Sequence, residues 1–124
     1  MRIAIIDYGA GNTQSVKYAL KRLGCEGVLT SDKEVISNSD KVIFPGVGQA
    51  SSAMKKLQSE GLDLLIPNLK QPVLGICLGM QLMCNFSEEG NTECLKIFNS
   101  KVKKFDNSLK VPQVGWNTIF DLKT

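Results

Sequence analysis

Short apolar runs alternate with stripes of apolar residues at helical spacing through the first two thirds of the chain. A short apolar run bounded by turn-forming residues is typical of a buried strand, and strands that are apolar on both faces are typical of parallel sheets. The predicted strands span residues 2–7, 27–30, 41–44 and 72–76.

Three further stretches carry apolar residues three and four positions apart, which is the core-facing stripe of a helix. Asn12 or Thr13 can cap the first of these helices, and Gly24 stands where it should end. Strands that alternate with helices imply parallel pairing, so we predict an α/β fold with a mostly parallel open sheet and helices on both faces. The stripes are Val16, Ala19, Leu20 and Leu23; Ala50, Ala53, Met54 and Leu57; and Leu78, Leu82 and Met83 within a helix predicted over residues 78–86.

The alternation of strand and helix patterns ends after Gly90. Residues 96–105, 110–114 and 116–120 have the pattern of strands joined by short turns, which predicts an antiparallel extension. A length of 124 residues with 43% hydrophobic content is enough for one core and too little for two. We therefore expect a single domain spanning residues 1–124.

Charge and cysteine content argue against several classes of protein. The net charge is only +3, and the cluster of Lys101, Lys103 and Lys104 is better explained as a solvated segment than as a nucleic-acid contact. The apolar run at the N-terminus stops at Asp7, too early for a signal peptide or a membrane span, so we expect a cytoplasmic protein. Four cysteines without a CxxC pair, and no histidine, favour free thiols with neither a metal nor a cofactor.

The strongest local signal is a cysteine between two glycines at the end of a predicted strand. A nucleophile held on a tight strand-to-helix turn needs small residues two positions before and after it, and Gly75 and Gly79 meet that need around Cys77. The N–H of Leu78 is then unpaired by the helix and can point at a developing oxyanion, while Gln81 lies one helical turn from the thiol. The alternative is that Cys77 is a small buried residue packed at a strand end.

Two glycine-containing loops follow predicted strands. Loops at the carboxyl ends of parallel strands form the usual site of open α/β folds. The loop at residues 45–48 could supply a second oxyanion donor from Val47 or Gly48, or it could be an ordinary turn. The loop at residues 8–12 resembles a dinucleotide-binding turn but has Gln14 where that motif needs glycine, so a structural role is favoured.

Other reactive or polar residues have ordinary explanations beside functional ones. Cys84 lacks a glycine frame and is predicted to lie in the core. Glu88 and Glu89 form an acidic pair of the kind that is usually solvated, although either carboxylate could bind the ammonium group of an amino acid. Trp116 is the single tryptophan, and it is expected to pack in a core or to face a partner.

Several segments together resemble the class I glutamine amidotransferases. The segment GICLGMQ is similar to the nucleophile motif of that family, and PGVG is similar to its oxyanion strand. The segments IDYGAGN, SEEG and VPQVGWN narrow the resemblance to the glutaminase subunits of imidazole glycerol phosphate synthase. The resemblance covers nearly the whole chain and implies a flavodoxin-like fold. In that order, the segments span residues 75–81, 45–48, 6–12, 87–90 and 111–117.

The resemblance implies a reaction and the residues that perform it. Cys77 attacks the side-chain carbonyl of glutamine and forms a thioester. Backbone N–H groups near Leu78 and near Val47 and Gly48 hold the oxyanion that develops on the carbonyl. The products are glutamate and ammonia.

The resemblance also implies a substrate pocket and a partner. Gln81 and Glu89 match positions that bind glutamine, and Trp116 matches a residue that faces a cyclase subunit. The ammonia passes to that cyclase within a heterodimer, which makes imidazole glycerol phosphate and an aminoimidazole carboxamide ribonucleotide in histidine biosynthesis.

Two features depart from the family pattern. Gln113 stands where many members have histidine. Family members run to roughly 200 residues, about one domain, and their catalytic histidine and glutamate lie beyond position 124. We therefore expect a fragment that is incomplete at its C-terminus and that is inactive, or nearly so, when alone.

Two other functions remain open at this point. Another amidotransferase, such as the glutaminase of pyridoxal phosphate synthesis, would share the turn around Cys77, but the Tyr8 loop and the Trp116 segment argue against it. A non-catalytic redox or interaction protein of similar fold would account for the absence of histidine.

Overall fold

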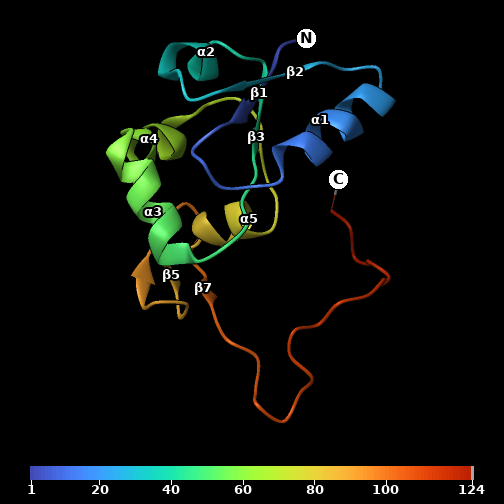
Figure 1. Ribbon diagram of the computed structural model, residues 1–124, viewed down its shortest axis with the longest axis vertical. Helices are drawn as coiled ribbons and strands as arrows, with labels where there is room; N and C mark the ends of the chain where they lie inside the picture. Colours follow the sequence, from blue (N-terminus) through green and yellow to red (C-terminus); the bar gives the residue numbers. More distant parts are fainter. Residues whose placement is uncertain (124) are drawn as a thin grey trace.

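A four-stranded parallel sheet forms the centre of the molecule. The computed structural model describes residues 1–123 (Figure 1). The strands are β1 (Ile3–Ile6), β2 (Gly27–Thr30), β3 (Lys41–Phe44) and β4 (Val73–Gly75), and they lie in the order β2-β1-β3-β4. All three pairings are parallel. This is the order of a doubly wound sheet with its switch point between β1 and β3, which confirms the predicted fold class.

The two faces of the sheet pack against different helices, α1 on one side and α3 and α4 on the other (Figure 1). Ile3, Ile5 and Ile43 form a small core with Leu20 of α1. The larger core lies on the opposite face, where the alternate residues Ala4, Ile6, Val42 and Phe44 pack against the remaining helices. The helices are α1 (Thr13–Arg22), α2 (Lys33–Ser37), α3 (Ala50–Ser59), α4 (Leu62–Leu65), the 3₁₀ helix η1 (Ile66–Asn68) and α5 (Leu78–Leu82).

The predicted helical stripes are mostly confirmed. All four apolar residues predicted for the second stripe are buried in α3. Leu23, predicted to face the core, is 76% exposed, because α1 ends at Arg22 and Leu23 lies in the cap after the last turn. Helix α2 was not predicted, since it has only five residues and depends on a local cap: the Asp32 carboxylate accepts hydrogen bonds from the N–H groups of Glu34 and Val35.

Helix α5 is shorter than the predicted helix over residues 78–86. It ends at Leu82, and residue 86 already belongs to a strand. The Leu82 carbonyl accepts the N–H of Leu95 at 2.8 Å, and the Met83 carbonyl accepts N–H groups from Ile97 and Phe98 at 2.9 Å. Residues that return from the following segment thus form hydrogen bonds with the carbonyls that a longer helix would have used.

A second, three-stranded sheet follows α5, and it differs from the predicted antiparallel extension. Its strands are β5 (Phe86–Ser87), β6 (Thr92–Glu93) and β7 (Lys101–Val102). β5 pairs antiparallel with β6 but parallel with β7, so this sheet is mixed. The predictions of strands at 110–114 and 116–120 are wrong. Within the strand predicted at 96–105, only residues 101–102 form a strand, β7.

Residues 103–123 form an irregular chain that leaves the folded body (Figure 1). Their side chains are exposed along the whole segment. An alternating apolar pattern forms a strand only when a neighbouring strand pairs with its backbone and a core covers one face, and neither condition is met here. None of the helices within residues 1–123 combines the length and the apolar composition needed to cross a membrane.

Two glycines allow α5 to lie directly against the sheet. A Cβ atom on Gly79 would overlap the Phe44 carbonyl oxygen and lie 3.1 Å from the Pro45 carbonyl carbon. A Cβ on Gly75 would lie 2.7 Å from the Met83 sulfur and 2.8 Å from the Met80 Cα. Apart from the Met83 sulfur, these atoms belong to the backbone and cannot rotate away.

Gly79→Ala should therefore lower the free energy of unfolding by about 1–3 kcal/mol or more, because α5 must move off the end of β3. The matched control is Gly115→Ala, whose Cβ would meet a side-chain atom only at 3.8 Å. Urea denaturation of both variants measures the difference. Equal stability of the two variants would contradict the close packing of α5.

Tyr8 generates a second prediction. Burial, and to a lesser degree the negative charge of a Cys77 thiolate, raise the pKa of Tyr8 above its ordinary value of 10.0. The folded chain then holds this proton more tightly than the unfolded chain, so stability that is fully present below about pH 10 is lost as the pH rises above it. The denaturant midpoint should fall more steeply with rising pH for the native chain than for Tyr8→Phe. The comparison covers about one pH unit on each side of pH 10. Tyr18→Phe, at a 56% exposed position, should keep the steep fall, and a Tyr8→Phe slope equal to the native slope would exclude this linkage.

Candidate functional site

Cys77 lies on a strained turn between β4 and α5. Its backbone angles are φ 53° and ψ −117°, a region that non-glycine residues rarely occupy. Such strain persists only where the surroundings impose it, and here Gly75 and Gly79 allow the turn to pack on both sides. The predicted tight strand-to-helix turn is present, and the thiol is exposed at its tip, in contrast to the buried alternative.

The thiol opens into a cavity of about 820 Å³. Gln81, predicted to share a face with the thiol, lines the same cavity, and so does Glu89. Residues of the irregular segment after β7, including Gln113, also line this cavity. The structure therefore brings together three of the residues selected from the sequence. The lining residues are Cys77, Gln81, Ser87, Glu88, Glu89, Val102, Lys103, Lys104, Phe105, Val111, Pro112 and Gln113.

The loop at residues 45–48, here named the Pro45 loop, lies against the Cys77 turn. The N–H of Leu78 donates a 3.2 Å hydrogen bond to the Gly46 carbonyl. This N–H was expected to be free for a substrate oxygen, and in the structure the loop carbonyl occupies it. Val47 is 54% exposed, and Gly48 has a φ of 101°, which favours glycine.

Tyr8 joins the loop after β1 to the Pro45 loop. Its hydroxyl donates a 2.7 Å hydrogen bond to the Pro45 carbonyl, and its ring centroid lies 5.5 Å from that of Phe44. The side chain is 2% exposed. Sequence reasoning gave this loop a structural role without identifying Tyr8, because a contact between residues 37 positions apart leaves no trace in local spacing.

Glu89 approaches the other end of the Pro45 loop. Its Oε2 atom accepts a 3.0 Å hydrogen bond from the N–H of Ala50, the first residue of α3. The buried Ser87 accepts a 3.2 Å hydrogen bond from the Glu89 N–H, and Thr92 donates to the Glu89 carbonyl at 2.9 Å. Glu89 thus caps α3 from a neighbouring loop, a favourable place for a carboxylate. Glu88 accepts a 2.7 Å bond from the Lys104 N–H.

The remaining residues selected from the sequence lie elsewhere. Cys84 is half-buried, so the prediction of a core position holds only in part, and Cys94 is the buried cysteine. Burial also raises the pKa of the Cys94 thiol. Trp116 is fully exposed in the irregular C-terminal segment, so a core role is excluded within the described chain.

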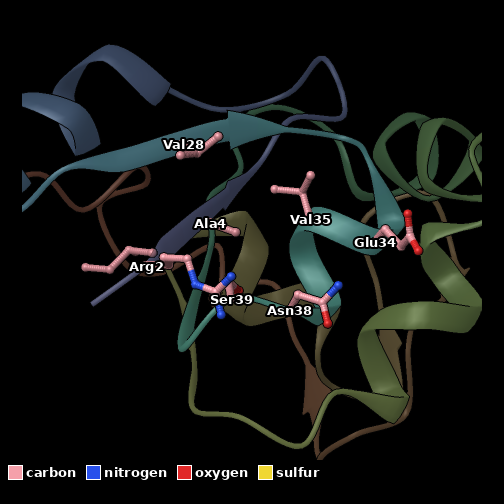
Figure 2. A pocket seen from close by; sticks show the side chains of 8 residues that line it. Arg2, Ala4, Val28, Glu34, Val35, Asn38 and Ser39 are labelled. Atoms are coloured by element: carbon pink, nitrogen blue, oxygen red, sulfur yellow. The ribbon is translucent and has the colours of Figure 1, made fainter.

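A second cavity of about 290 Å³ lies at the amino ends of β1 and β2, beside α2 (Figure 2). Apolar side chains of Ala4, Val28 and Val35 border it, together with the polar side chains of Arg2 and Asn38 (Figure 2). None of the residues lining it belongs to the Cys77 turn or to the Pro45 loop. The Cys77 cavity, at the carboxyl ends of the strands, is therefore the candidate site.

Comparison with known proteins places the chain in a family. The model of the class-I glutamine amidotransferase family matches residues 4–122. The chain is 61% identical to imidazole glycerol phosphate synthase subunit HisH of Bacteroides fragilis (strain YCH46) over 127 residues, which cover 100% of this chain and 65% of that protein. It is 50% identical to the subunit of the same name from Haemophilus influenzae (strain ATCC 51907 / DSM 11121 / KW20 / Rd) over 120 residues, which cover 96% of this chain and 60% of the relative.

A solved structure described as a glutamine amidotransferase superposes with a TM-score of 0.68 at 21% identity, covering 81% of this chain and 55% of that one. This likeness supports the fold. The chain spans at most 65% of the length of the curated relatives named above. Because the family model matches almost the whole chain, the chain belongs to the class-I glutamine amidotransferase family.

Proposed function

We propose that this chain carries the nucleophile and much of the substrate pocket of a glutaminase that hydrolyses glutamine to glutamate and ammonia. The observation that carries the proposal is the exposed Cys77 thiol, held at a positive φ and facing a cavity that it shares with Gln81 and Glu89. Family membership supports the reaction class, and the strained turn supports Cys77 as the residue that performs it.

The reaction begins with attack of the Cys77 thiolate on the side-chain carbonyl carbon of glutamine. A C–S bond forms and the carbonyl electrons move to oxygen, which becomes an oxyanion. When that oxyanion collapses, the C–N bond breaks, and the nitrogen leaves as ammonia after it gains a proton. Water then attacks the thioester, which releases glutamate and restores the thiol.

Backbone donors at the Cys77 turn are proposed to hold the oxyanion. The N–H of Leu78 is one donor, and an N–H of Val47 or Gly48 is the second. In the structure Leu78 donates to the Gly46 carbonyl at 3.2 Å, so a substrate oxygen must replace or share that acceptor. The cost is small, since a net backbone hydrogen bond is worth about 0.5–1.5 kcal/mol.

Gln81 and Glu89 are proposed to hold the amino-acid end of glutamine. The Gln81 amide can donate to and accept from polar substrate groups. The Glu89 carboxylate uses one oxygen to cap α3, and its other lone pairs remain able to accept from an ammonium group. The exposed Glu88 lines the same cavity, and its carboxylate accepts a hydrogen bond from the Lys104 N–H.

The proton transfers are assigned to a group outside these 124 residues, which contain no histidine. Such a group must take the thiol proton and later deliver a proton to the leaving nitrogen. We further propose that the protein acts in the cytoplasm, as the hydrolase subunit of a lyase complex.

The partner is proposed to be a cyclase subunit that forms a heterodimer and consumes the ammonia in histidine biosynthesis. The names of the relatives, as subunits of imidazole glycerol phosphate synthase, support this proposal. Trp116, fully exposed, supplies an aromatic anchor of the kind that protein interfaces favour. These names also favour catalysis over a non-catalytic redox or interaction role.

A chloromethyl ketone analogue of glutamine tests the proposed nucleophile. At a mildly alkaline pH where ordinary thiols ionise, it should alkylate Cys77 and spare Cys84, and excess glutamine should slow the reaction. Peptide mass spectrometry locates the label. Cys77→Ser should abolish labelling and Cys84→Ser should preserve it; a label found mainly on Cys84 would reject the assignment.

Glutamine turnover tests the assignment of the proton transfers. The 124-residue chain should release ammonia no faster than its Cys77→Ser variant, since general acid–base catalysis is worth about 10²–10⁴-fold. Added imidazole should restore part of the Cys77-dependent rate. Rapid turnover by the chain alone, without imidazole, would show that no external group is required.

A further inference from the structure

Tyr8 is a buried ionisable side chain that the proposed reaction does not use. It lies under the Pro45 loop, between the ends of β1 and β3. Its position is specific, because a Cβ atom on Gly46 would overlap the Tyr8 hydroxyl and lie 2.9 Å from the Gly79 nitrogen. The phenol oxygen therefore occupies the space that a side chain at position 46 would need.

Two consecutive carbonyls of the Pro45 loop are held from outside the loop. The Pro45 carbonyl accepts from the Tyr8 hydroxyl at 2.7 Å, and the Gly46 carbonyl accepts from the Leu78 N–H at 3.2 Å. A peptide group is planar, so a hydrogen bond to a carbonyl also sets the direction of the N–H that follows it. Tyr8 thereby fixes the first peptide of the loop, and the Cys77 turn fixes the second.

The bond from Tyr8 is the stronger constraint of the two. It is shorter, it is buried, and its donor is held by the packing of its ring against Phe44. Pro45 and Gly46 are themselves buried, so loss of the hydroxyl would leave the Pro45 carbonyl unpaired away from water. Such an unpaired group costs about 1–3 kcal/mol, a cost that a change in loop conformation would avoid.

We propose that Tyr8 is a positioning residue: its hydroxyl holds the peptide between Pro45 and Gly46, and this anchor sets where the next two residues of the loop, Val47 and Gly48, present their N–H groups beside Cys77. This inference rests on the proposed glutaminase function, because it gives those N–H groups the task of binding an oxyanion. Tyr8 acts through the loop and does not touch the reacting atoms.

The test compares Tyr8→Phe with a control in the purified chain. Tyr8→Phe removes one oxygen and keeps the ring. Tyr18→Phe makes the same change at an exposed position. Two quantities are measured: the hydrogen–deuterium exchange rate of residues 45–49, and the ratio of Cys77 alkylation by the glutamine chloromethyl ketone to alkylation by iodoacetamide.

Tyr8→Phe should speed exchange in the Pro45 loop and should lower the alkylation ratio by about tenfold, because a displaced oxyanion donor slows reaction with the glutamine analogue but leaves simple thiol access unchanged. The Tyr18→Phe control should keep the native ratio. Unchanged exchange, or an unchanged ratio in Tyr8→Phe, would overturn the inference. If exchange speeds up but the native chain shows no preference for the glutamine reagent, the proposed function fails instead.

A measurement on the native chain covers the case in which Tyr8→Phe does not fold. The Tyr8 hydroxyl proton should give a slowly exchanging nuclear magnetic resonance signal close to Pro45, as expected for a buried hydrogen bond of 2.7 Å. A rapidly exchanging hydroxyl would overturn the inference.

Discussion

The close approach of α5 to the end of β3 is the contact on which the site depends. Gly79 lies so near the Phe44 carbonyl that no side chain fits between them. This contact sets the angle at which the chain leaves β4, and so it imposes the positive φ of Cys77 at the tip of the turn. The backbone N–H of Ile76, which donates to the Phe44 carbonyl at 3.0 Å, holds the same junction from the other side. The strained backbone is thus a consequence of packing between β3, β4 and α5.

The position of the Pro45 loop depends on that junction and on two long-range contacts. Tyr8 binds its first carbonyl, and Glu89 caps the helix that follows it. Three segments far apart in the sequence therefore meet at one edge of the sheet, the carboxyl ends of its strands. Preorganised backbone donors stabilise a developing charge more effectively than mobile ones, because they need no rearrangement during the reaction. The packing of the core and the chemistry of the site are linked through this loop.

Local patterns in the sequence were sufficient for the sheet, for the stripe of α3 and for the Cys77 turn, since each depends on residues within a few positions of one another. Three features depended on distant partners and were not predictable in this way: the end of α5 at Leu82, the hydrogen bond from Leu78 to Gly46, and the cap that Glu89 provides. The strands predicted after residue 109 did not form because the distant partners that they need are missing from the described chain. Their alternating pattern is present, but the described chain offers them no strand to pair with and no core to cover.

The central claim is that the Cys77 sulfur forms a covalent bond with the acyl group of glutamine. The most direct measurement is acid quenching of the protein, purified together with the proposed cyclase subunit, during turnover of radiolabelled glutamine, followed by peptide mapping. We expect a labelled glutamyl thioester on the peptide that contains Cys77, and loss of that label after treatment with hydroxylamine. Active turnover with no covalent label on that peptide, or with the label on another residue, would contradict the claim.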